Sequence, residues 1–449
     1  MEREVALYKS YGFSGGVHPP ENKELTEKKV IVQCPPPPQV IIPVQQHIGA
    51  PSKPIVEKGT VVRIGDLVSE SSGFVSVPAH ASISGTVATV ENRPHPFGMP
   101  VLSVVIENDG QEKWNPDITF DEKYLDLDRR EMLDRIRNAG LAGMGGAAFP
   151  THVKLNPPAD KKIDTVLLNG AECEPYLTSD HQLMLQEPQK IIQGLQLIQK
   201  ILGAKNVAIG VEDNKTDAVK VLKKAIAGLK FACQVVVLHV KYPQGAEKQL
   251  IKAVTGRSVP SGGLPMDVGC VVQNVGTAAA VYDAVAFKKP LIERVVTVTG
   301  AGIREPRNVL TRIGTPYSFL FEFCGGMTED VGKIIMGGPM MGLAQSSLDA
   351  MVIKGTSGIV LFTQKQSRRL QERTCISCAR CVDVCPMKLL PKMLGLLVRN
   401  NRIDESKQYH VMDCIECGCC SYVCPAHINL VHLIKHGKSQ LIKKTKKAS

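Results

Sequence analysis

The sequence predicts a multidomain protein that combines α+β and α/β units. At 449 residues, with 43% hydrophobic and 22% charged residues, the chain is longer than one core usually supports and is typical of folded domains. After Trp114 its pattern changes from short β segments to alternating helices and strands. Nine of its 14 cysteines lie in the last fifth of the chain, eight of them in two regularly spaced runs. We therefore expect four globular units between an N-terminal segment, residues 1–28, and a basic tail, residues 435–449.

The first globular unit, residues 29–118, consists of short β segments. Val40 to Val44 and Val101 to Ile106 have strand composition and are separated by prolines and glycines. The segment Val75 to Val87 resembles the hairpin of lipoyl and biotinyl carrier domains, but no lysine stands at its tip. The sequence therefore predicts a β barrel-sandwich scaffold without a swinging cofactor.

The second unit, residues 119–292, alternates helices and strands, which predicts an α/β layer architecture. We expect helices near residues 131–138, 190–202 and 216–229, and strands near residues 165–169, 206–211, 234–240 and 268–274. A third, β-rich unit covers residues 293–362. A polar linker then leads into the cysteine-rich unit, residues 363–434.

The cysteine-rich unit carries the strongest motif. Two runs of C-x2-C-x2-C-x3-C-P are typical of ferredoxins with two [4Fe-4S] clusters, in which the fourth cysteine of each run ligates the other cluster. A zinc ribbon is the alternative, but it usually pairs two C-x2-4-C loops. Cys419 falls outside the spacing and is expected to be a bystander. The predicted ligands are Cys375, Cys378, Cys381 and Cys424 for the first cluster, and Cys414, Cys417, Cys420 and Cys385 for the second.

Two loops of the second unit could hold a nucleotide. Gly143 to Ala148 formally fits a G-x-G-x-x-A fingerprint, but the fingerprint requires a preceding strand and here a helix is expected. The loop is therefore either a phosphate-binding loop or a plain glycine turn. Asn169, Glu172 and Glu174 follow a predicted strand at its carboxyl end, where α/β proteins place ligand groups, although the carboxylates could equally cap a turn.

The pairing of clusters with a nucleotide site has a chemical consequence. Iron-sulfur clusters move single electrons, whereas nicotinamides move hydride. A flavin performs both kinds of transfer, so a chain that joins NAD to clusters needs one.

Charge and hydropathy restrict the partners and the location. The net charge of +11 is compatible with nucleic acid, an anionic membrane surface or acidic proteins, but 5% aromatic residues and no recognition motif argue against nucleic acid. No run of about 18 apolar residues is present and the start lacks a secretion signal, so a cytoplasmic chain without a spanning helix is expected. The lysine-rich tail is predicted to be solvated and disordered.

Six segments together resemble the RnfC family, the peripheral subunits of Rnf ion-translocating electron-transport complexes. The resemblance covers nearly the whole chain, and both cysteine runs fall in the expected place. The segments are residues 12–20, 140–150, 169–176, 241–250, 273–277 and 336–340.

The resemblance also implies domains and site residues. The middle unit is similar to the flavin- and NADH-binding subunit of respiratory complex I, and the third unit resembles a β-grasp (SLBB) domain. By that similarity, Gly143, Gly145, Gly146, Lys154, Asn169 and Asn274 would hold FMN, Phe149, Glu172 and Glu174 would lie near FMN or the nicotinamide, and Lys241, Gly245, Glu247 and Lys248 would complete the nucleotide pocket. Ala148 stands where many relatives have glycine, a mild departure in the phosphate loop.

The function implied by the resemblance is electron transfer between iron-sulfur clusters and NAD(H) through FMN, coupled by partner subunits to Na+ or H+ translocation. The implied partners are the membrane subunits, an iron-sulfur ferredoxin-like subunit and NADH, at the cytoplasmic face of the cell membrane. A soluble flavin and iron-sulfur reductase, such as a cobalamin reductase, is the alternative, but that family lacks the opening segment Gly12 to Pro20. A ferredoxin adaptor that only relays electrons would require a middle unit without a nucleotide.

Overall fold

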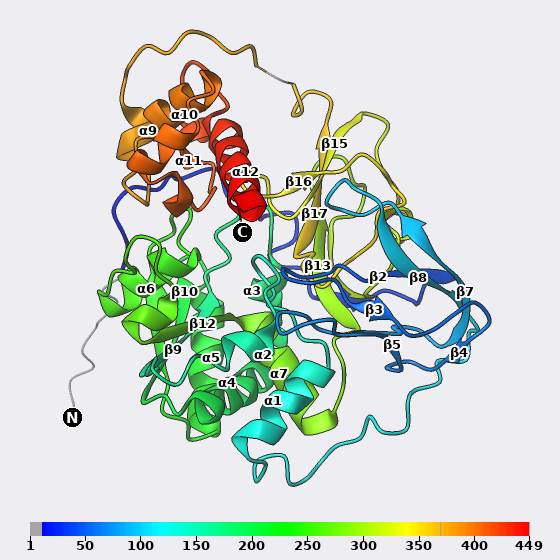
Figure 1. Cartoon of the computed structure of the whole chain (residues 1–449). Coiled ribbons are helices and arrows are strands. Elements are labelled where there is room, and N and C mark those ends of the chain that lie inside the picture. Colours follow the sequence, from blue (N-terminus) through cyan, green and yellow to red (C-terminus); the bar gives the residue numbers. More distant parts are fainter. Residues whose placement is uncertain (1–10, 369, 449) are drawn as a thin grey trace.

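A computed structural model describes residues 11–368 and 370–448 (Figure 1). The barrel-sandwich region is formed by two small antiparallel sheets, with strand orders β2-β8-β7-β4 and β3-β5-β6. Their valines and isoleucines alternate inward and share one continuous hydrophobic core with the α/β region. The strands are β2 (Gln39–Pro43), β3 (Lys53–Pro54), β4 (Val61–Val62), β5 (Leu67–Glu70), β6 (Ala79–His80), β7 (Gly85–Arg93) and β8 (Val101–Asn108).

The α/β region is built on a four-stranded parallel sheet with the order β11-β10-β9-β12. Its strands are apolar and buried because helices cover them, as parallel sheets require. The strands are β9 (Thr165–Gly170), β10 (Asn206–Glu212), β11 (Gln234–Leu238) and β12 (Cys270–Asn274). The helices are α1 (Arg129–Asn138), α2 (Thr151–Lys154), α3 (Ser179–Gln186), α4 (Pro188–Leu202), α5 (Thr216–Gly228), α6 (Glu247–Thr255) and α7 (Val275–Phe287), with a 3-10 turn at Pro265–Val268.

A six-stranded mixed sheet follows, with the order β1-β14-β13-β17-β15-β16. Its edge strand β1 (Ile31–Gln33) pairs in parallel with β14, although those residues lie inside the range predicted for the barrel-sandwich unit. The remaining strands are β13 (Glu293–Thr299), β14 (Arg307–Arg312), β15 (Val331–Met336), β16 (Leu343–Ala344) and β17 (Gly358–Thr363), and helix α8 (Tyr317–Phe323) packs into the core of this region.

The C-terminal region consists of short helices around the two cysteine runs. They are α9 (Arg380–Asp383), α10 (Pro391–Arg399), α11 (Cys419–Tyr422) and α12 (Leu430–Ala448), with 3-10 turns at Asp404–Tyr409 and Val411–Asp413. The prediction of a disordered basic tail is wrong, because α12 includes most of it and packs against α10 (Figure 1). Ile434 and Leu441 are buried at helical spacing, whereas Lys435, Lys443 and Lys444 are exposed.

Within residues 11–368 and 370–448, no helix is long and apolar enough to cross a membrane.

Candidate functional site

The glycine loop lies between α1 and α2, so a helix precedes it, as expected from the sequence. Gly145 has a φ of +75°, and a Cβ added there would stand 2.6 Å from Asn274 Nδ2. Gly145, Gly146 and Ala147 are exposed, and nothing lies within 4 Å of a Cβ added at Gly146. The Met144 amide donates to Thr277 Oγ1 at 2.8 Å and fixes the loop against the start of α7. The loop therefore presents open backbone on a fixed support, which is what close approach of a phosphate requires.

Two asparagines mark the sheet edge beside this loop. Asn169 lies near the end of β9 and Asn274 ends β12, and the two residues are direct register partners on neighbouring parallel strands. The Asn169 amide donates to the Gly245 carbonyl at 2.9 Å, and Asn274 Oδ1 accepts from the Gly276 amide at 2.8 Å as the N-cap of α7. The sheet thus brings together groups that are about 100 residues apart in the sequence, at the edge where parallel sheets bind ligands.

Lys154 and Glu247 close the same region. Lys154, at the end of α2, forms an ion pair of 2.6 Å with Glu247, the first residue of α6. Both side chains are about one-third exposed, so a ligand in the site can reach them. Phe149 is half-buried, and its carbonyl accepts from the Gly143 amide at 2.8 Å.

The two acidic residues after β9 already have protein partners. Glu172 has a φ of +47°, and its carboxylate accepts from the amides of Asp180 and His181, at 2.8 and 3.0 Å, at the start of α3. The Glu174 carboxylate accepts from the amides of Met340 and Met341 at 3.0 and 2.9 Å. Each carboxylate therefore ties the loop after β9 to a neighbouring element.

Glu174 is partly buried, and burial of its carboxyl raises the pKa of that group to about 7, opposed by the hydrogen bonds from Met340 and Met341. A side chain at Gly338 would overlap Glu174 Oε2, so this contact needs glycine in the loop after β15. The acidic loop is thereby fastened to the six-stranded sheet.

Two buried lysines that the sequence analysis did not single out support the acidic loop from inside. Lys23 Nζ donates to the carbonyls of Glu172, Glu174 and Leu177 at 2.8, 3.1 and 2.5 Å. Lys215 Nζ donates to the Ala171 carbonyl at 2.8 Å and pairs with Glu212 at 2.8 Å. Burial lowers the pKa of Lys23, and the neighbouring charge of Lys215 adds to the effect. Nothing in the local sequence pattern around these lysines signals the role, because their partners are distant in the chain.

Asp180 is a further residue that sequence reasoning missed. Its Oδ2 accepts from Asn274 Nδ2 at 2.6 Å, which orients the amide beside Gly145. Burial, followed by the charge of Glu172, raises the pKa of Asp180 to about 7.

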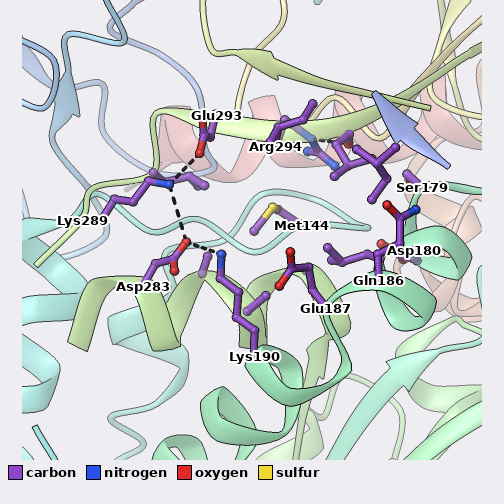
Figure 2. A pocket seen from close by; sticks show the side chains of 18 of the residues that line it. Met144, Ser179, Asp180, Gln186, Glu187, Lys190, Asp283, Lys289, Glu293 and Arg294 are labelled. Carbon is purple, nitrogen blue, oxygen red and sulfur yellow. Dashed lines mark hydrogen bonds and ion pairs between the residues drawn. The ribbon is translucent and has the colours of Figure 1, made fainter. Parts of the chain in front are cut away.

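Asp180 also lines a cavity of about 310 Å³ between the α/β region and β13 (Figure 2). Met144 of the glycine loop lies on the cavity wall, and Arg294 enters from β13 with a pKa that burial lowers to about 10. A row of ion pairs forms one side and holds the two regions together: Lys190–Asp283 at 2.7 Å, Lys289–Asp283 at 4.0 Å and Lys289–Glu293 at 2.6 Å.

The cysteines form two groups that cross between the runs. One small cavity is lined by Cys375, Cys378 and Cys381 of the first run with Cys424 of the second. Another is lined by Cys414, Cys417 and Cys420 of the second run with Cys385 of the first, together with Cys419. This is the grouping that the ferredoxin spacing predicts.

The chemistry of the two cavities fits clusters better than single ions. A zinc ion would draw four thiols together with Zn–S bonds of about 2.3 Å. Across the described ranges, no three His, Cys, Asp or Glu side chains converge closely enough to hold one metal ion. Four thiols spaced around a common cavity are instead what a [4Fe-4S] cubane requires.

The second cysteine cavity lies against the nucleotide region. The Tyr242 hydroxyl donates to the Cys417 carbonyl at 2.9 Å, and Cys173 of the acidic loop packs in one apolar cluster with Cys417 and Cys419. The Gly245 amide lies 3.4 Å from Cys173 Sγ. The loop whose Gly245 carbonyl accepts from Asn169 therefore also contacts this apolar group of residues. The first cavity is more open, since Cys375 and Cys378 are exposed.

Residues 11–18, here called the N-terminal strap, run between the α/β and C-terminal regions (Figure 1). Val17 and Tyr242 exchange backbone hydrogen bonds of 2.8 and 2.9 Å, and the Gly16 amide donates to the Val384 carbonyl at 2.8 Å. A side chain at Gly15 would stand 2.9 Å from the Cys385 carbonyl, which explains the glycine pair.

Two of the residues predicted to complete the nucleotide pocket, Lys241 and Lys248, have partners away from the glycine loop, in the N-terminal strap and the C-terminal region. Lys241 Nζ donates to the Phe13 carbonyl at 2.9 Å and lies 4.8 Å from the centre of the Phe13 ring. Lys248 lies near Asp413. Burial would raise the pKa of Asp413, but hydrogen bonds from Ser261 and Gly262, together with the charge of Lys248, lower it.

Comparison with family models matches four parts of the chain. Residues 11–111 match the RnfC barrel sandwich hybrid domain, residues 136–283 the Nuo51 FMN-binding domain, residues 295–344 the SLBB domain and residues 374–428 the 4Fe-4S dicluster domain. The predicted fold class and the predicted cofactors are therefore confirmed.

Full-length relatives agree with these matches. The chain is 51% identical to the C subunit of the proton-translocating ferredoxin:NAD(+) oxidoreductase complex of Clostridium ljungdahlii, over 95% of this chain and 93% of that protein. It is 49% identical to the C subunit of the Na(+)-translocating complex of Acetobacterium woodii, over 97% and 98%. It is 39% identical to the C subunit of the ion-translocating oxidoreductase complex of Rhodobacter capsulatus, over 96% and 83%. The chain therefore belongs to the RnfC family, the C subunits of ion-translocating oxidoreductase complexes.

Proposed function

We propose that this chain passes electrons between NAD(H) and two [4Fe-4S] clusters through FMN, as a peripheral subunit of an ion-translocating complex. The observation that carries the proposal is the direct contact between the two redox regions. The loop that follows β9 touches the second cysteine cavity through Cys173, and Tyr242 bonds to the Cys417 carbonyl. Electrons therefore have a short protein route from the nucleotide region to that cavity.

The cysteine assignments follow from the two cavities. Cys385, Cys414, Cys417 and Cys420 would hold the cluster that faces the nucleotide region, and Cys375, Cys378, Cys381 and Cys424 the cluster on the open side. The exposed cysteines of the first cavity suit it to exchange electrons with another protein. A ferredoxin-like iron-sulfur subunit of the complex is the partner that this chemistry fits.

The nucleotide assignments follow from the sheet edge. The exposed amides of Gly145 and Gly146 would bind the flavin phosphate, while Asn169, Asn274, Lys154 and Glu247 would orient its polar groups. Bound FMN would supply the exchange between hydride and single electrons. Glu172 and Glu174 hold the surrounding loop in place through the amide hydrogen bonds that they accept.

The relatives support assembly into a membrane complex. The names of two relatives attribute translocation to the complex, of protons in one and of Na+ in the other. In keeping with the family resemblance, we assign this chain a peripheral place at the cytoplasmic face, bound to membrane subunits. No described helix of the chain could span a bilayer.

The test is reduction by NADH in anaerobic, FMN-loaded protein. NADH should bleach the iron-sulfur absorption of the wild type. Gly145→Leu should bind no FMN and lose NADH-driven bleaching, because a side chain there meets Asn274 and the residue needs a positive φ. Dithionite should still reduce its clusters.

A matched control is Gly228→Leu, at the end of α5, where nothing lies within 4 Å of an added Cβ. It should retain FMN. Normal flavin content and NADH-driven bleaching in Gly145→Leu would show that the glycine loop is only a turn.

A further inference from the structure

Tyr242 stands at the boundary between the α/β region and the second cysteine cavity. Its side chain is 2% exposed, and its hydroxyl donates to the Cys417 carbonyl at 2.9 Å. The Glu174 carboxyl lies near the same phenol, because burial and then the charge of Glu174 raise the pKa of Tyr242. A buried phenol is thus aimed at the backbone of a cysteine loop.

The surrounding contacts fix the position of this phenol. The N-terminal strap pairs with both backbone groups of Tyr242 through Val17. Gln249 donates to the Pro386 carbonyl at 3.2 Å, and Asp413 accepts from the Gly262 amide at 2.9 Å, so the cysteine loops are docked on either side. A Cβ added at Gly418 would stand 3.1 Å from the Met340 carbonyl, which closes the remaining side. The hydroxyl therefore has little freedom to turn away from Cys417.

We propose that Tyr242 is a positioning residue that raises the reduction potential of the second cluster through its hydrogen bond to the Cys417 carbonyl. The potential of an iron-sulfur cluster depends on its net charge, on hydrogen bonds to its sulfurs and on solvent exposure, and a fixed dipole beside a cysteine loop acts on the same charge. The positive end of the O–H dipole points at the loop that carries Cys417, which stabilises an added electron. Burial keeps water from screening that dipole. This inference rests on the proposed ligation of the second cluster by Cys417.

The direct test is Tyr242→Phe in the full-length, cluster-loaded protein, followed by a redox titration monitored by paramagnetic resonance. The signal lost in Cys417→Ser identifies the second cluster. We expect the equilibrium constant for one-electron reduction of that cluster to fall about tenfold, which equals a potential lower by about 59 mV. The first cluster should keep its potential.

A second substitution preserves the volume of the side chain. Replacement of Tyr242 by a difluorinated tyrosine gives a more acidic phenol and a stronger donor, so the potential of the second cluster should rise. If Tyr242→Phe loses its clusters, the fluorinated variant still tests whether the hydrogen bond from residue 242 changes the potential of the second cluster. The matched control is Tyr176→Phe, whose ring packs on Phe362 in the six-stranded sheet, and both potentials should then be unchanged.

Three results would overturn the inference: an unchanged second cluster in iron-replete Tyr242→Phe, an equal shift of both clusters, or a downward shift with the fluorinated residue. Iron and sulfide analysis of the wild type distinguishes failure of the Tyr242 inference from failure of the proposed function. Wild-type protein with far fewer than about eight irons and eight sulfides per chain would contradict the dicluster assignment itself.

Discussion

Asp180 gives the glycine-loop region a pH dependence of known sign. Its folded pKa is raised to about 7 by burial and by Glu172, whereas an unfolded aspartate titrates near 3.9. Between these two pKa values the folded chain binds more protons than the unfolded chain. The stability that Asp180 contributes is therefore present at low pH and is lost as pH rises toward 7. The slope from one group is at most about 1.4 kcal/mol per pH unit.

Asp180→Asn should remove this contribution. Its neutral amide can still accept from Asn274, so the thermal midpoint of the variant should gain on that of the wild type as pH rises from about 4 to 7. Thermal unfolding of both proteins across this range measures the difference. A gap between the two midpoints that stays constant with pH would mean that Asp180 is ionised throughout.

Cys385 tests the crossing of the two cysteine runs. Cys385→Ser should weaken the cluster that also uses Cys414, Cys417 and Cys420, because all four line one cavity. Paramagnetic resonance of the reduced protein should show loss of that signal and retention of the other. Cys419→Ser is the control and should keep both signals, since the Cys419 thiol points toward the Tyr242 carbonyl at 3.9 Å. Loss of the cluster shared by Cys375, Cys378 and Cys381 in Cys385→Ser would disprove the crossing.

At the scale of elements, α12 packs over the second cysteine loop. Lys438 donates to the Cys414 carbonyl at 2.8 Å and pairs with Glu416 at 2.7 Å, while Ile434 is 1% exposed against the C-terminal core. The helix therefore covers the second cysteine loop and excludes water from it.

Ile434→Ala should leave a cavity under α12 and cost about 2 to 5 kcal/mol of local stability. We expect faster loss of iron on warming, followed by the decay of cluster absorption. Ile442→Ala on the same helix is the control, because Ile442 is 43% exposed and its truncation should change little. Equal decay rates in the two variants would show that α12 does not protect the cluster.

Local patterns predicted the elements that local chemistry determines. The strands of the α/β sheet appear where apolar runs predicted them, as in β9, and the cysteine spacing predicted which thiols share a cavity. Two elements escaped because tertiary packing decides them. Ile31 to Gln33 pairs with the distant strand β14 instead of the adjacent barrel-sandwich strands. In α12, the many lysines made the few apolar residues of the buried helix face hard to recognise in the sequence.

The candidate site shows the same division. Gly145 and Asn169 could be chosen from a glycine fingerprint and from a strand end, whereas Asn274 was implied only by the family resemblance. Lys23 and Tyr242 could not, because their partners lie roughly 150 and 175 residues further along the chain and only docking brings them together. Glu172 and Glu174 were expected either to bind a ligand or to cap a turn, and the structure shows that both carboxylates accept from backbone amides.

At the scale of the whole molecule, one acidic loop links three regions. Glu172 connects it to α3, Glu174 to the loop after β15, and Cys173 to the second cysteine cavity. The N-terminal strap joins two of these regions again through Val17 and Gly16. A shift of the C-terminal region would therefore also displace the acidic loop. We expect electron transfer to take place while the α/β and C-terminal regions stay in contact.

The peripheral assignment leads to the last prediction, which concerns membranes that contain the assembled complex. With a net charge of +11, the chain should be retained on those membranes by contacts with other subunits and by electrostatic attraction. Salt at about 1 M shortens the Debye length to about 3 Å and screens such attraction. Washing with high salt or a chaotrope should therefore release most of the chain into the supernatant, detected by immunoblotting, while an integral subunit stays in the pellet. Retention of this chain until detergent is added would contradict a peripheral location.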